Sequence, residues 1–359
     1  MTAPQEIPGL AELGKEVPIG DIDQELREFF ATDETVTKAS LLNLAVYSEQ
    51  SDALATNPPI IRELTRENAC RSLLVLSLHG PERSVRAWVE AHCHLTEAGA
   101  KAACSEQVSF LLIGGSPSLV RSMIFSNTDS DLPLVLWWQG EMSEVFEERL
   151  HARIDRLIFD SAQWATPTAP LFRLSASLKE GARFVPHDLS FTRGSALRAC
   201  LAACFEDPRS LEALPQLDAI EIRHSPGQQG FMAALWLITW ITHRLGWTLQ
   251  GSASIQGTYL FRSNNGRTVE ANLLSTPDSG PALVGLKTWG AGFVFEASLD
   301  DDQDYWKLLI QFDTLQQESL FPARSQTPCG LLGEILGRAG RNRSMIEALP
   351  RLRELLVSN

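Results

Sequence analysis

Hydrophobic and polar positions follow two different patterns along this chain, and the change comes near residue 162. In the first half, short apolar runs alternate with amphipathic segments. The runs at 73–78, 108–113, 132–138 and 157–159 predict strands, and the segments at 81–95, 118–125 and 145–154 predict helices. Strands and helices that alternate at this spacing are typical of βα units on a mostly parallel sheet.

The second half predicts helices beside a run of strands. An amphipathic helix is predicted at 195–205, a short strand at 219–223, and a helix at 226–245 that is apolar on nearly every side. β-rich segments follow at 252–262, 267–274, 282–288 and 293–298, with hairpin turns at 264–266 and 290–292, and the tail at 328–356 is helical. This pattern predicts an α+β domain with an antiparallel meander and a helical C-terminal tail.

Three segments follow from these patterns. Residues 1–34, rich in proline and glycine at the start, are predicted to be loose; residues 35–162 form an α/β (Rossmann-like) domain, and residues 163–359 form the α+β domain. The Asn-Pro-Pro break at 57–59 is expected to precede a short helix at 60–70. A chain of 359 residues is long enough for each domain to bury its own core.

Charge and hydropathy exclude several classes of partner. The formal net charge is −13 and no run of Lys or Arg offsets it locally, which argues against nucleic acid or an anionic membrane as a partner. The first residues lack the basic and apolar regions of a secretory signal, and the apolar stretch at 231–242 is shorter than the ~20 residues of a membrane span. The sequence therefore predicts a cytoplasmic protein.

Two adjacent tryptophans, Trp137 and Trp138, end one of the predicted strands. Successive strand residues point to opposite faces, so the two indoles cannot share one core layer. One of them is expected to cover a helix, a ligand or a partner on the other face.

The turn Gly114-Gly115-Ser116 lies between a predicted strand and a predicted helix, where backbone N–H groups could hold a phosphate. It lacks the G-x-G-x-x-G spacing and a Walker lysine, so it meets neither nucleotide fingerprint. Two glycines followed by a proline also make an ordinary tight βα turn.

Metal chemistry is not favoured by the histidines and cysteines. His92 and His94 are two residues apart on a predicted helix, so they cannot converge on one face, and no CxxC pair is present. His92 is predicted to be a packed, hydrogen-bonded side chain. Cys93 and Cys104 would form a regulatory disulfide if their Cα atoms lie within ~7 Å.

Other cysteines and the usual catalytic motifs give no site. Cys200 and Cys204 belong to an apolar helix stripe and are predicted to be inert, buried thiols. The chain has no G-x-S-x-G elbow, no H-E-x-x-H motif and no acidic metal cage. We therefore predict no catalytic residue, no metal and no cofactor.

Several segments resemble, in the same order, those of one known family. They are RSLLVL at 71–76, RAWVEAHC at 86–93, CSEQV at 104–108, PSLVR at 117–121, LPLVLWW at 132–138, DRLIFDS at 155–161, DLSFTR at 188–193, ALWL at 234–237 and HRLGW at 243–247. Together they resemble the glucose-6-phosphate dehydrogenase assembly protein (OpcA) family, collinearly over residues 35–357.

The resemblance implies a non-enzymatic partner that binds glucose-6-phosphate dehydrogenase, promotes its active oligomer and raises its activity in the oxidative pentose phosphate pathway. Redox control is described for photosynthetic members, but the cysteine doublet often found before Glu-Gln is here Ala103-Cys104-Ser105, with one thiol. The family has no established catalytic residues, so none is transferred to this chain.

Candidate partner contacts are Trp137, Trp138, Arg121 and Arg193, because aromatic residues and arginine dominate protein interfaces. The alternative is a sugar-phosphate or nucleotide-binding enzyme or sensor that uses the Gly114-Gly115 turn. A third interpretation is a redox relay through Cys93 and Cys104.

Overall fold

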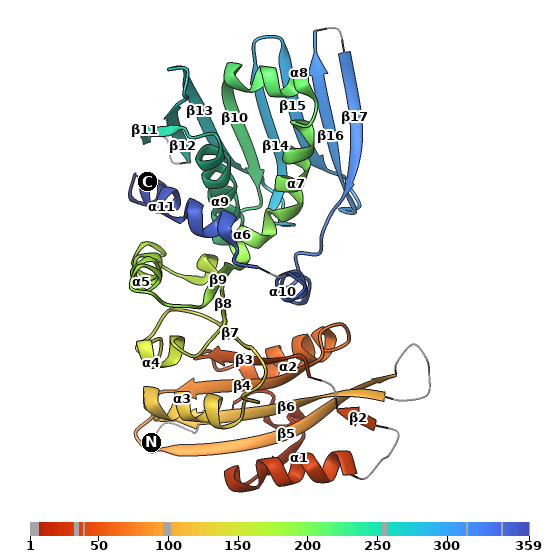
Figure 1. Cartoon of the computed structure of the whole chain (residues 1–359), viewed down its shortest axis with the longest axis vertical. Coiled ribbons are helices and arrows are strands. Elements are labelled where there is room, and N and C mark those ends of the chain that lie inside the picture. The colour runs from red at the N-terminus through yellow and green to blue at the C-terminus, as the bar shows by residue number, and fades with distance from the viewer. Residues whose placement is uncertain are drawn as a thin grey trace. The chain divides into compact units, whose positions relative to one another are not determined.

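The computed structural model describes residues 7–31, 36–38, 40–95, 102–252, 257–313, 315–338 and 340–358. The chain forms two compact units, each with one large β-sheet (Figure 1). The N-terminal unit comprises Met1–Asp160, Ala176–His187 and Leu332–Gly340, and the C-terminal unit comprises Ser161–Ser175, Asp188–Leu331 and Arg341–Asn359. No helix among the described residues is long and apolar enough to cross a membrane.

The N-terminal sheet has the strand order β1-β5-β6-β4-β3-β7-β8-β9, with β2 paired to β6. Its strands are β1 (Lys15–Val17), β2 (Val36–Lys38), β3 (Leu42–Ser48), β4 (Cys70–Leu78), β5 (Ser84–Leu95), β6 (Ala102–Ile113), β7 (Leu134–Trp138), β8 (Arg156–Phe159) and β9 (Val185–Asp188). Strands β6, β4, β3, β7 and β8 are mutually parallel, which confirms the α/β prediction. Their order is the 3-2-1-4-5 order of a doubly wound dinucleotide-binding sheet.

Helices complete the N-terminal unit: α1 (Ile22–Ala31), α2 (Ala53–Leu64), α3 (Pro117–Ser126) and α4 (Glu148–His151). The central strands are buried on both faces, so apolar residues occur in consecutive runs along them rather than at every second residue. This explains why the sequence shows them as continuous apolar runs.

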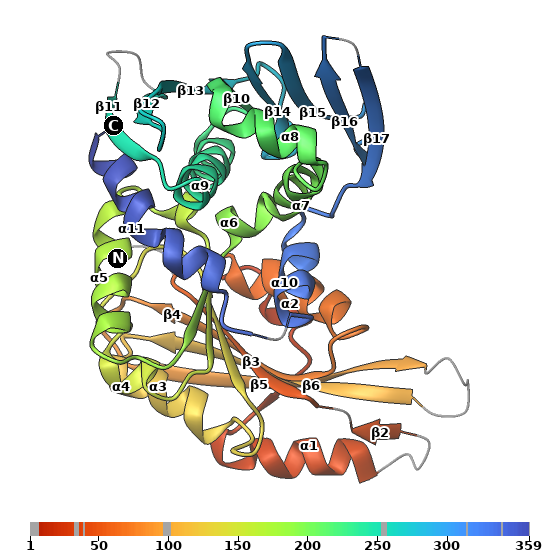
Figure 2. The same ribbon diagram turned by 45° about the horizontal axis from the view of Figure 1, so that its top comes forward.

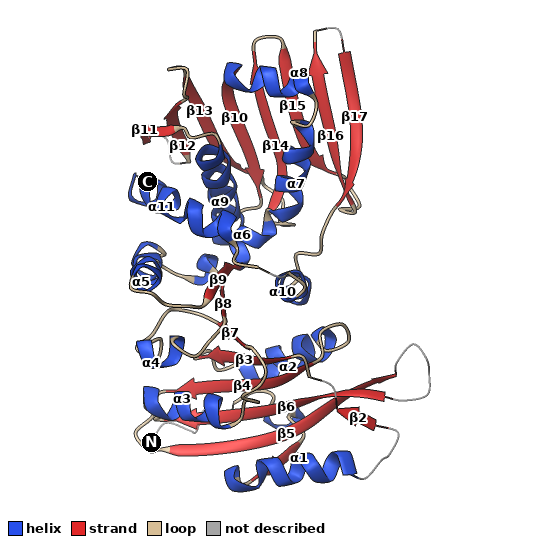
Figure 3. Cartoon of the chain, in the orientation of Figure 1, coloured by secondary structure: helices blue, strands red, loops and turns tan. Residues whose placement is uncertain are grey.

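The predicted helix at 81–95 is wrong. Residues 84–95 form β5, which pairs antiparallel with β6 along its full length (Figure 3). Val85, Trp88 and Val89 fit one face of a helix, but they are also β-branched or aromatic residues that favour strands. Pairing with β6 decides that this segment forms a strand rather than a helix. A local sequence pattern does not contain that pairing.

Two further local predictions are corrected. The break expected at 57–59 lies inside α2, where the Asn57 side-chain amide donates to the Ala53 carbonyl (2.9 Å). The segment at 1–34 is not loose throughout, because β1 pairs with β5, and Leu13 and Val17 are buried. Residues 1–6 and 32–34 lie outside the described residues.

Cys93 and Cys104 form a disulfide that joins β5 to β6. The two residues are directly opposite in the antiparallel register, and their Cα atoms are 4.0 Å apart. Cys93 is exposed and Cys104 is fully buried. The bridge therefore has one face open to solvent, and its redox role remains a prediction.

The C-terminal unit is built on the sheet β11-β12-β13-β10-β14-β15-β16-β17. The strands are β10 (Leu217–His224), β11 (Thr248–Ser252), β12 (Thr258–Arg262), β13 (Thr268–Ser275), β14 (Leu283–Gly290), β15 (Phe293–Leu299), β16 (Tyr305–Phe312) and β17 (Leu315–Pro322). Both predicted hairpin turns are confirmed, between β12 and β13 and between β14 and β15. The prediction missed β16 and β17, and β10 pairs with β13 in parallel, so the sheet is mixed.

The helices of this unit include α5 (Thr168–Lys179), which begins in this unit, α6 (Leu189–Arg193), α7 (Ser195–Cys204), α8 (Pro208–Ala213), α9 (Gln228–Arg244) and α11 (Arg343–Ser358); α10 (Pro328–Leu336) precedes α11. Helices α7, α9 and α11 pack on the C-terminal sheet, and α7 and α9 cover the same face of it (Figures 1 and 2). The short helices η1 (Leu10–Glu12), η2 (Ile19–Asp21), η3 (Ser161–Gln163) and η4 (Leu214–Gln216) complete the set. Helix α9 is buried on almost every side, as its sequence predicts.

Asp188 connects three elements of the C-terminal unit from a fully buried position. Its carboxylate accepts the Ser161 N–H (3.1 Å), the Ser190 N–H that starts α6 (2.8 Å) and the Trp236 indole N–H of α9 (2.7 Å). Three donors compensate the cost of taking the carboxylate out of water. This carboxylate fixes the start of α6 relative to the central helix.

Titration of His187 is predicted to set the acid stability of the N-terminal unit. His187 lies on β9 with 5% of its surface exposed, and burial, aided by the nearby charges of Arg156 and Arg338, lowers its pKa to about 4. The unfolded value is about 6.5, so the stabilisation is complete above pH ~6.5 and is lost as the pH falls towards ~4. The difference corresponds to about 3 kcal/mol.

The measurement is urea unfolding at a series of pH values between these limits. His187→Gln is expected to flatten the pH dependence, whereas His79→Gln, at an exposed histidine, should leave it unchanged. An unaltered slope in His187→Gln would show that another group controls the acid transition.

Loss of the Cys93–Cys104 bridge is predicted to destabilise the N-terminal unit. The cysteines are 11 residues apart, and closing a loop of that size in the unfolded chain contributes about 3 kcal/mol. The double variant C93S/C104S and the reduced wild-type protein should therefore unfold at the same lower denaturant concentration. Thiol counting by mass spectrometry confirms that the bridge is formed or reduced in each sample. A denaturant midpoint that is the same with and without reductant would contradict the prediction.

Candidate functional site

The carboxyl ends of the parallel strands are the first place to look for a site. In sheets with this strand order, ligands bind in the crevice where the order reverses, which here lies between β3 and β7. The residues that follow these two strands are Glu49 to Asp52 after β3 and Gln139-Gly140 after β7. Their chemistry decides what the crevice can hold.

The residues of this crevice do not fit a dinucleotide. A pyrophosphate needs a glycine turn after the first strand, but β3 is followed by Glu49-Gln50-Ser51-Asp52, with no glycine and two carboxylates. Glu49 accepts the Tyr47 hydroxyl (2.7 Å). Two carboxylates in this position would repel a phosphate group.

Side chains also fill the crevice. The amides of Asn57, on α2, and Gln139, after β7, exchange two hydrogen bonds of 3.0 and 2.7 Å, and both residues are buried. The Trp138 ring packs 4.4 Å from that of Tyr47, and its indole N–H donates to the Glu141 carbonyl (2.9 Å). The switch point of this sheet is therefore packed with side chains, and the carboxylates of Glu49 and Asp52 lie at its half-buried to exposed edge.

The Gly114-Gly115-Ser116 turn lies at the end of β6. Gly114 has φ +61°, and a Cβ there would lie 2.8 Å from the Gly80 carbonyl oxygen, so close chain packing requires glycine. Ser116 caps α3 by accepting the Leu119 N–H (3.4 Å). Local packing accounts for these residues, and their phosphate-binding role remains a prediction.

The predicted partner contacts are mostly buried. Trp137 is 4% exposed and Trp138 1%, because β7 lies between β3 and β8 and is covered on both faces. Arg193 is 7% exposed and donates to Ser190 Oγ (3.3 Å). Arg121 is half-buried and forms an ion pair with Glu147. The two tryptophans and Arg193 stabilise the core, so the expectation that they are partner contacts is corrected.

The predicted packing of His92, Cys200 and Cys204 is confirmed. His92 is buried and hydrogen-bonded to Gln107 Oε1 (3.0 Å), although it lies on a strand rather than a helix. Burial raises the pKa of Cys200 to about 11 and that of Cys204 to about 12, which makes both thiols unreactive. No cluster of three or more His, Cys, Asp or Glu residues that could hold a metal occurs within the described ranges.

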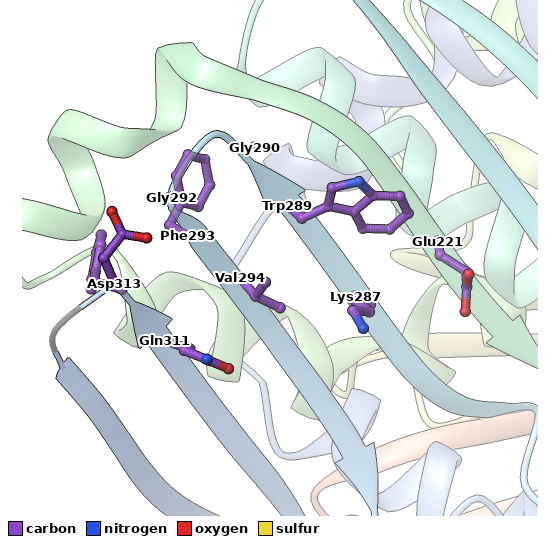
Figure 4. Close-up of a pocket in the computed structure, with 10 residues that line it drawn as sticks. Glu221, Lys287, Trp289, Gly290, Gly292, Phe293, Val294, Gln311 and Asp313 are labelled. Carbon is purple, nitrogen blue, oxygen red and sulfur yellow. The ribbon is translucent and has the colours of Figure 1, made fainter.

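A surface that the sequence did not predict lies on the C-terminal sheet. Helices α7 and α9 pack on one face of this sheet, and most side chains on the other face are half-buried or exposed. Figure 4 shows some of the residues of that other face, among them Lys287, Trp289 and Val294. Leu274, Tyr305 and Leu320 are 44%, 47% and 64% exposed there. We call this surface the open sheet face, defined by Glu221, Arg223, Leu274, Lys287, Trp289, Val294, Glu296, Tyr305, Lys307, Leu309, Gln311, Glu318 and Leu320.

Ion pairs that join β10, β14 and β15 form the centre of the open sheet face. Arg223 on β10 donates to Glu296 on β15 (3.0 Å), and Lys287 on β14 lies 3.7 Å from the same carboxylate. A Cβ at Gly285 would lie 2.6 Å from Arg223 Nη2, so glycine lets the guanidinium lie against the intervening strand. The charges are thereby held in a fixed pattern.

Beside these charges, a shallow pocket of about 470 Å³ lies around Trp289, with Val294, Gln311 and Asp313 among its lining residues. An aromatic side chain in a depression, surrounded by ordered charges, is typical of a protein interface. The signal in the sequence is the alternation in β16, where Tyr305, Lys307 and Leu309 lie between buried residues. It predicts a strand with one uncovered face, and the sequence interpretation missed it.

Family models match the chain in two consecutive parts. The model for the N-terminal domain of a glucose-6-phosphate dehydrogenase subunit matches residues 61–176. The model for the C-terminal domain of the same kind of subunit matches residues 185–349. The second match contains every strand of the C-terminal sheet.

Curated relatives carry the provisional name OxPP cycle protein OpcA. The protein from Nostoc punctiforme is 25% identical over 229 residues, which cover 62% of this chain and 48% of the relative. The protein from Synechococcus elongatus is also 25% identical over 229 residues, with 62% and 51% covered. This chain thus spans about half the length of the curated relatives it matches.

Solved structures that resemble this one include oxidoreductases. KijD10, a 3-ketoreductase from Actinomadura kijaniata, is 10% identical with a TM-score of 0.48, over 88% of this chain and 96% of that chain. The UDP-N-acetylglucosamine 3-dehydrogenase GnnA from Acidithiobacillus ferrooxidans is 9% identical with a TM-score of 0.46, over 90% and 98%. Likeness at this level assigns neither an activity nor a cofactor to this chain.

The family matches cover most of both units in chain order and agree with the segments that resemble the family in sequence. This chain therefore belongs to the glucose-6-phosphate dehydrogenase assembly protein family, OpcA.

Proposed function

We propose that this chain is a non-catalytic partner that binds glucose-6-phosphate dehydrogenase in the cytoplasm, promotes its active oligomer and raises its activity. The observation that carries this proposal is the pair of consecutive matches at 61–176 and 185–349 to models described as domains of a subunit of that dehydrogenase.

The crevice of the N-terminal sheet supports a binding role over an enzymatic one. Glu49 and Asp52 follow the strand whose turn would have to cradle a nucleotide phosphate, and the Asn57–Gln139 amide pair occupies the reversal point. A nucleotide-dependent reaction at this edge of the sheet would have to displace buried, hydrogen-bonded side chains.

Activation would work as a population shift. A protein that binds the active oligomer of the dehydrogenase more tightly than its inactive state shifts the equilibrium towards the active oligomer. A difference in binding free energy of about 2.7 kcal/mol changes the ratio of the two states ~100-fold. No chemistry by this chain is required.

We assign the contact with the dehydrogenase to the open sheet face. This face lies wholly within the part of the chain that matches the second of the two family models. Trp289 supplies an aromatic anchor, and Leu274 and Leu320 supply exposed apolar area elsewhere on the same face. The fixed charges of Arg223, Lys287 and Glu296 would orient the partner.

Addition of this protein is expected to raise dehydrogenase activity. The measurement is the rate against glucose 6-phosphate concentration for the cognate dehydrogenase, with and without a near-stoichiometric amount of this chain. A higher maximal rate or a lower apparent KM, together with a larger oligomer in size-exclusion chromatography, is the expected result. An unchanged rate and an unchanged elution volume would refute the proposal.

Substitutions on the open sheet face are expected to weaken binding of the dehydrogenase. Trp289→Ala removes the anchor and should weaken it by about 2 kcal/mol, or roughly 30-fold, and Leu320→Glu should act in the same direction. The matched control is Leu41→Glu on the N-terminal unit, since Leu41 is 73% exposed and Leu320 64%. Binding is measured by titration calorimetry on variants whose circular dichroism matches the wild type.

These binding measurements test the location of the interface independently of the proposed activation. If Leu41→Glu weakens binding as much as Leu320→Glu, or if both open-face variants bind normally, the contact lies elsewhere on the chain. Activation of the dehydrogenase by the wild-type protein would still stand in that case.

A further inference from the structure

A separate pocket lies on the helical side of the sheet in the C-terminal unit. It has a volume of about 220 Å³, is lined by residues of α7, α8, η4, α9 and strands β10 and β14, and opens to solvent where Ala202, Leu211 and Arg244 are exposed. Its lining is almost entirely apolar and includes Leu201, Phe205, Leu217, Ile220, Trp240 and Ile241. We call it the α7–α9 cavity.

The size of the α7–α9 cavity suits a small ring. An apolar cavity of about 150 Å³ is large enough to bind benzene. At 220 Å³ this pocket has room for a ring with a short substituent. Ala202 on α7 is the smallest side chain of the lining and is exposed, so a larger residue at this position would obstruct the opening of the pocket.

One polar atom is buried in this apolar lining. Thr288 on β14 is 4% exposed, and its Oγ1 has no hydrogen-bond partner among the described residues. Buried threonines elsewhere in the unit are satisfied: Thr239 and Thr242 donate to the carbonyls of Leu235 (2.6 Å) and Ile238 (2.8 Å). A buried hydroxyl without a partner is costly, so Thr288 points to a ligand atom that would bind it.

One charged side chain lies at the cavity. Arg244, the last residue of α9, is exposed and is the sole charged residue in the lining. The described part of the chain includes no ion pair or side-chain hydrogen bond for its guanidinium. A helix C-terminus favours a cation in any case, but a guanidinium beside an apolar cavity is also a donor for a carboxylate.

We propose that the α7–α9 cavity binds a small amphipathic carboxylate: a six-membered ring that carries a hydroxyl or carbonyl group on one side and a short carboxylate chain on the other. The ring lies among the leucines, Phe205 and Trp240, the hydroxyl or carbonyl hydrogen-bonds Thr288, and the carboxylate pairs with Arg244. The site is on the opposite side of the sheet from the open sheet face, and it does not depend on binding of the dehydrogenase.

Three related probes test each contact separately. They are para-hydroxyphenylpropionate, which has both polar groups, phenylpropionate, which lacks the hydroxyl, and para-propylphenol, which lacks the carboxylate. Binding to the full chain is measured by ligand-observed NMR and titration calorimetry. The first probe is expected to bind tightest, with losses of about tenfold for each missing group.

Variants of the chain identify the contacts. Arg244→Gln should weaken the two carboxylates about tenfold and leave para-propylphenol unchanged. Thr288→Val should weaken only the two hydroxylated probes, while Ala202→Phe, which obstructs the opening, should abolish binding of all three. Arg262→Gln, at an exposed arginine of β12, is the control and should change nothing.

Two results would overturn the proposal. One is that none of the three probes binds at millimolar concentration and that Thr288→Val raises the melting temperature. The Thr288 hydroxyl would then be a core group without a hydrogen-bond partner, and not part of a binding site. The other is binding that survives both Ala202→Phe and Arg244→Gln, which would place the probes elsewhere. Melting temperatures of the variants show that each is folded.

Discussion

The buried carboxylate of Asp188 is the constraint on which the C-terminal unit depends. It accepts hydrogen bonds from Ser161, Ser190 and the indole of Trp236, so it joins the entry to the unit, the start of α6 and the central helix α9. The Phe191 ring then packs on Trp236 at 5.2 Å, and the Arg198 guanidinium lies 3.7 Å from the centre of the Phe191 ring. Because α9 packs on β10, β13 and β14, its position determines which face of the sheet is covered.

The two faces of that sheet consequently have different roles. The covered face is the core, and the α7–α9 cavity lies on it between residues of α7, α8, α9 and the sheet. The uncovered face carries an ordered ion-pair network with Trp289 beside it, and both polar and apolar groups are held by strand register. A rigid strand surface of this kind loses little conformational entropy on binding, which suits a protein whose proposed action is to favour one state of a partner.

The N-terminal unit shows that strand order does not define chemistry. Its sheet has the order of a dinucleotide-binding fold, yet the decisive turn contains carboxylates instead of glycines, and the reversal point is filled by Asn57, Gln139, Tyr47 and Trp138. Function is therefore argued from side chains at the site and from family membership, not from topology.

The sequence by itself determined the elements whose signals are local. Apolar runs marked β4, β6, β7 and β8, helical periodicity marked α7 and α9, and Asn-Gly and Gly-Ala-Gly turns marked two hairpins. The sequence also indicated the family, because the segments that resemble it follow one another in the same order as in that family. The tertiary structure decided the rest, because strand pairing and burial join residues that are far apart in sequence. Residues 84–95 form a strand because they pair with β6, and Trp137 and Trp138 are buried because β7 lies between β3 and β8. The open sheet face exists because no helix of the described chain packs on that side of the sheet. The α7–α9 cavity exists because helices pack on the other side.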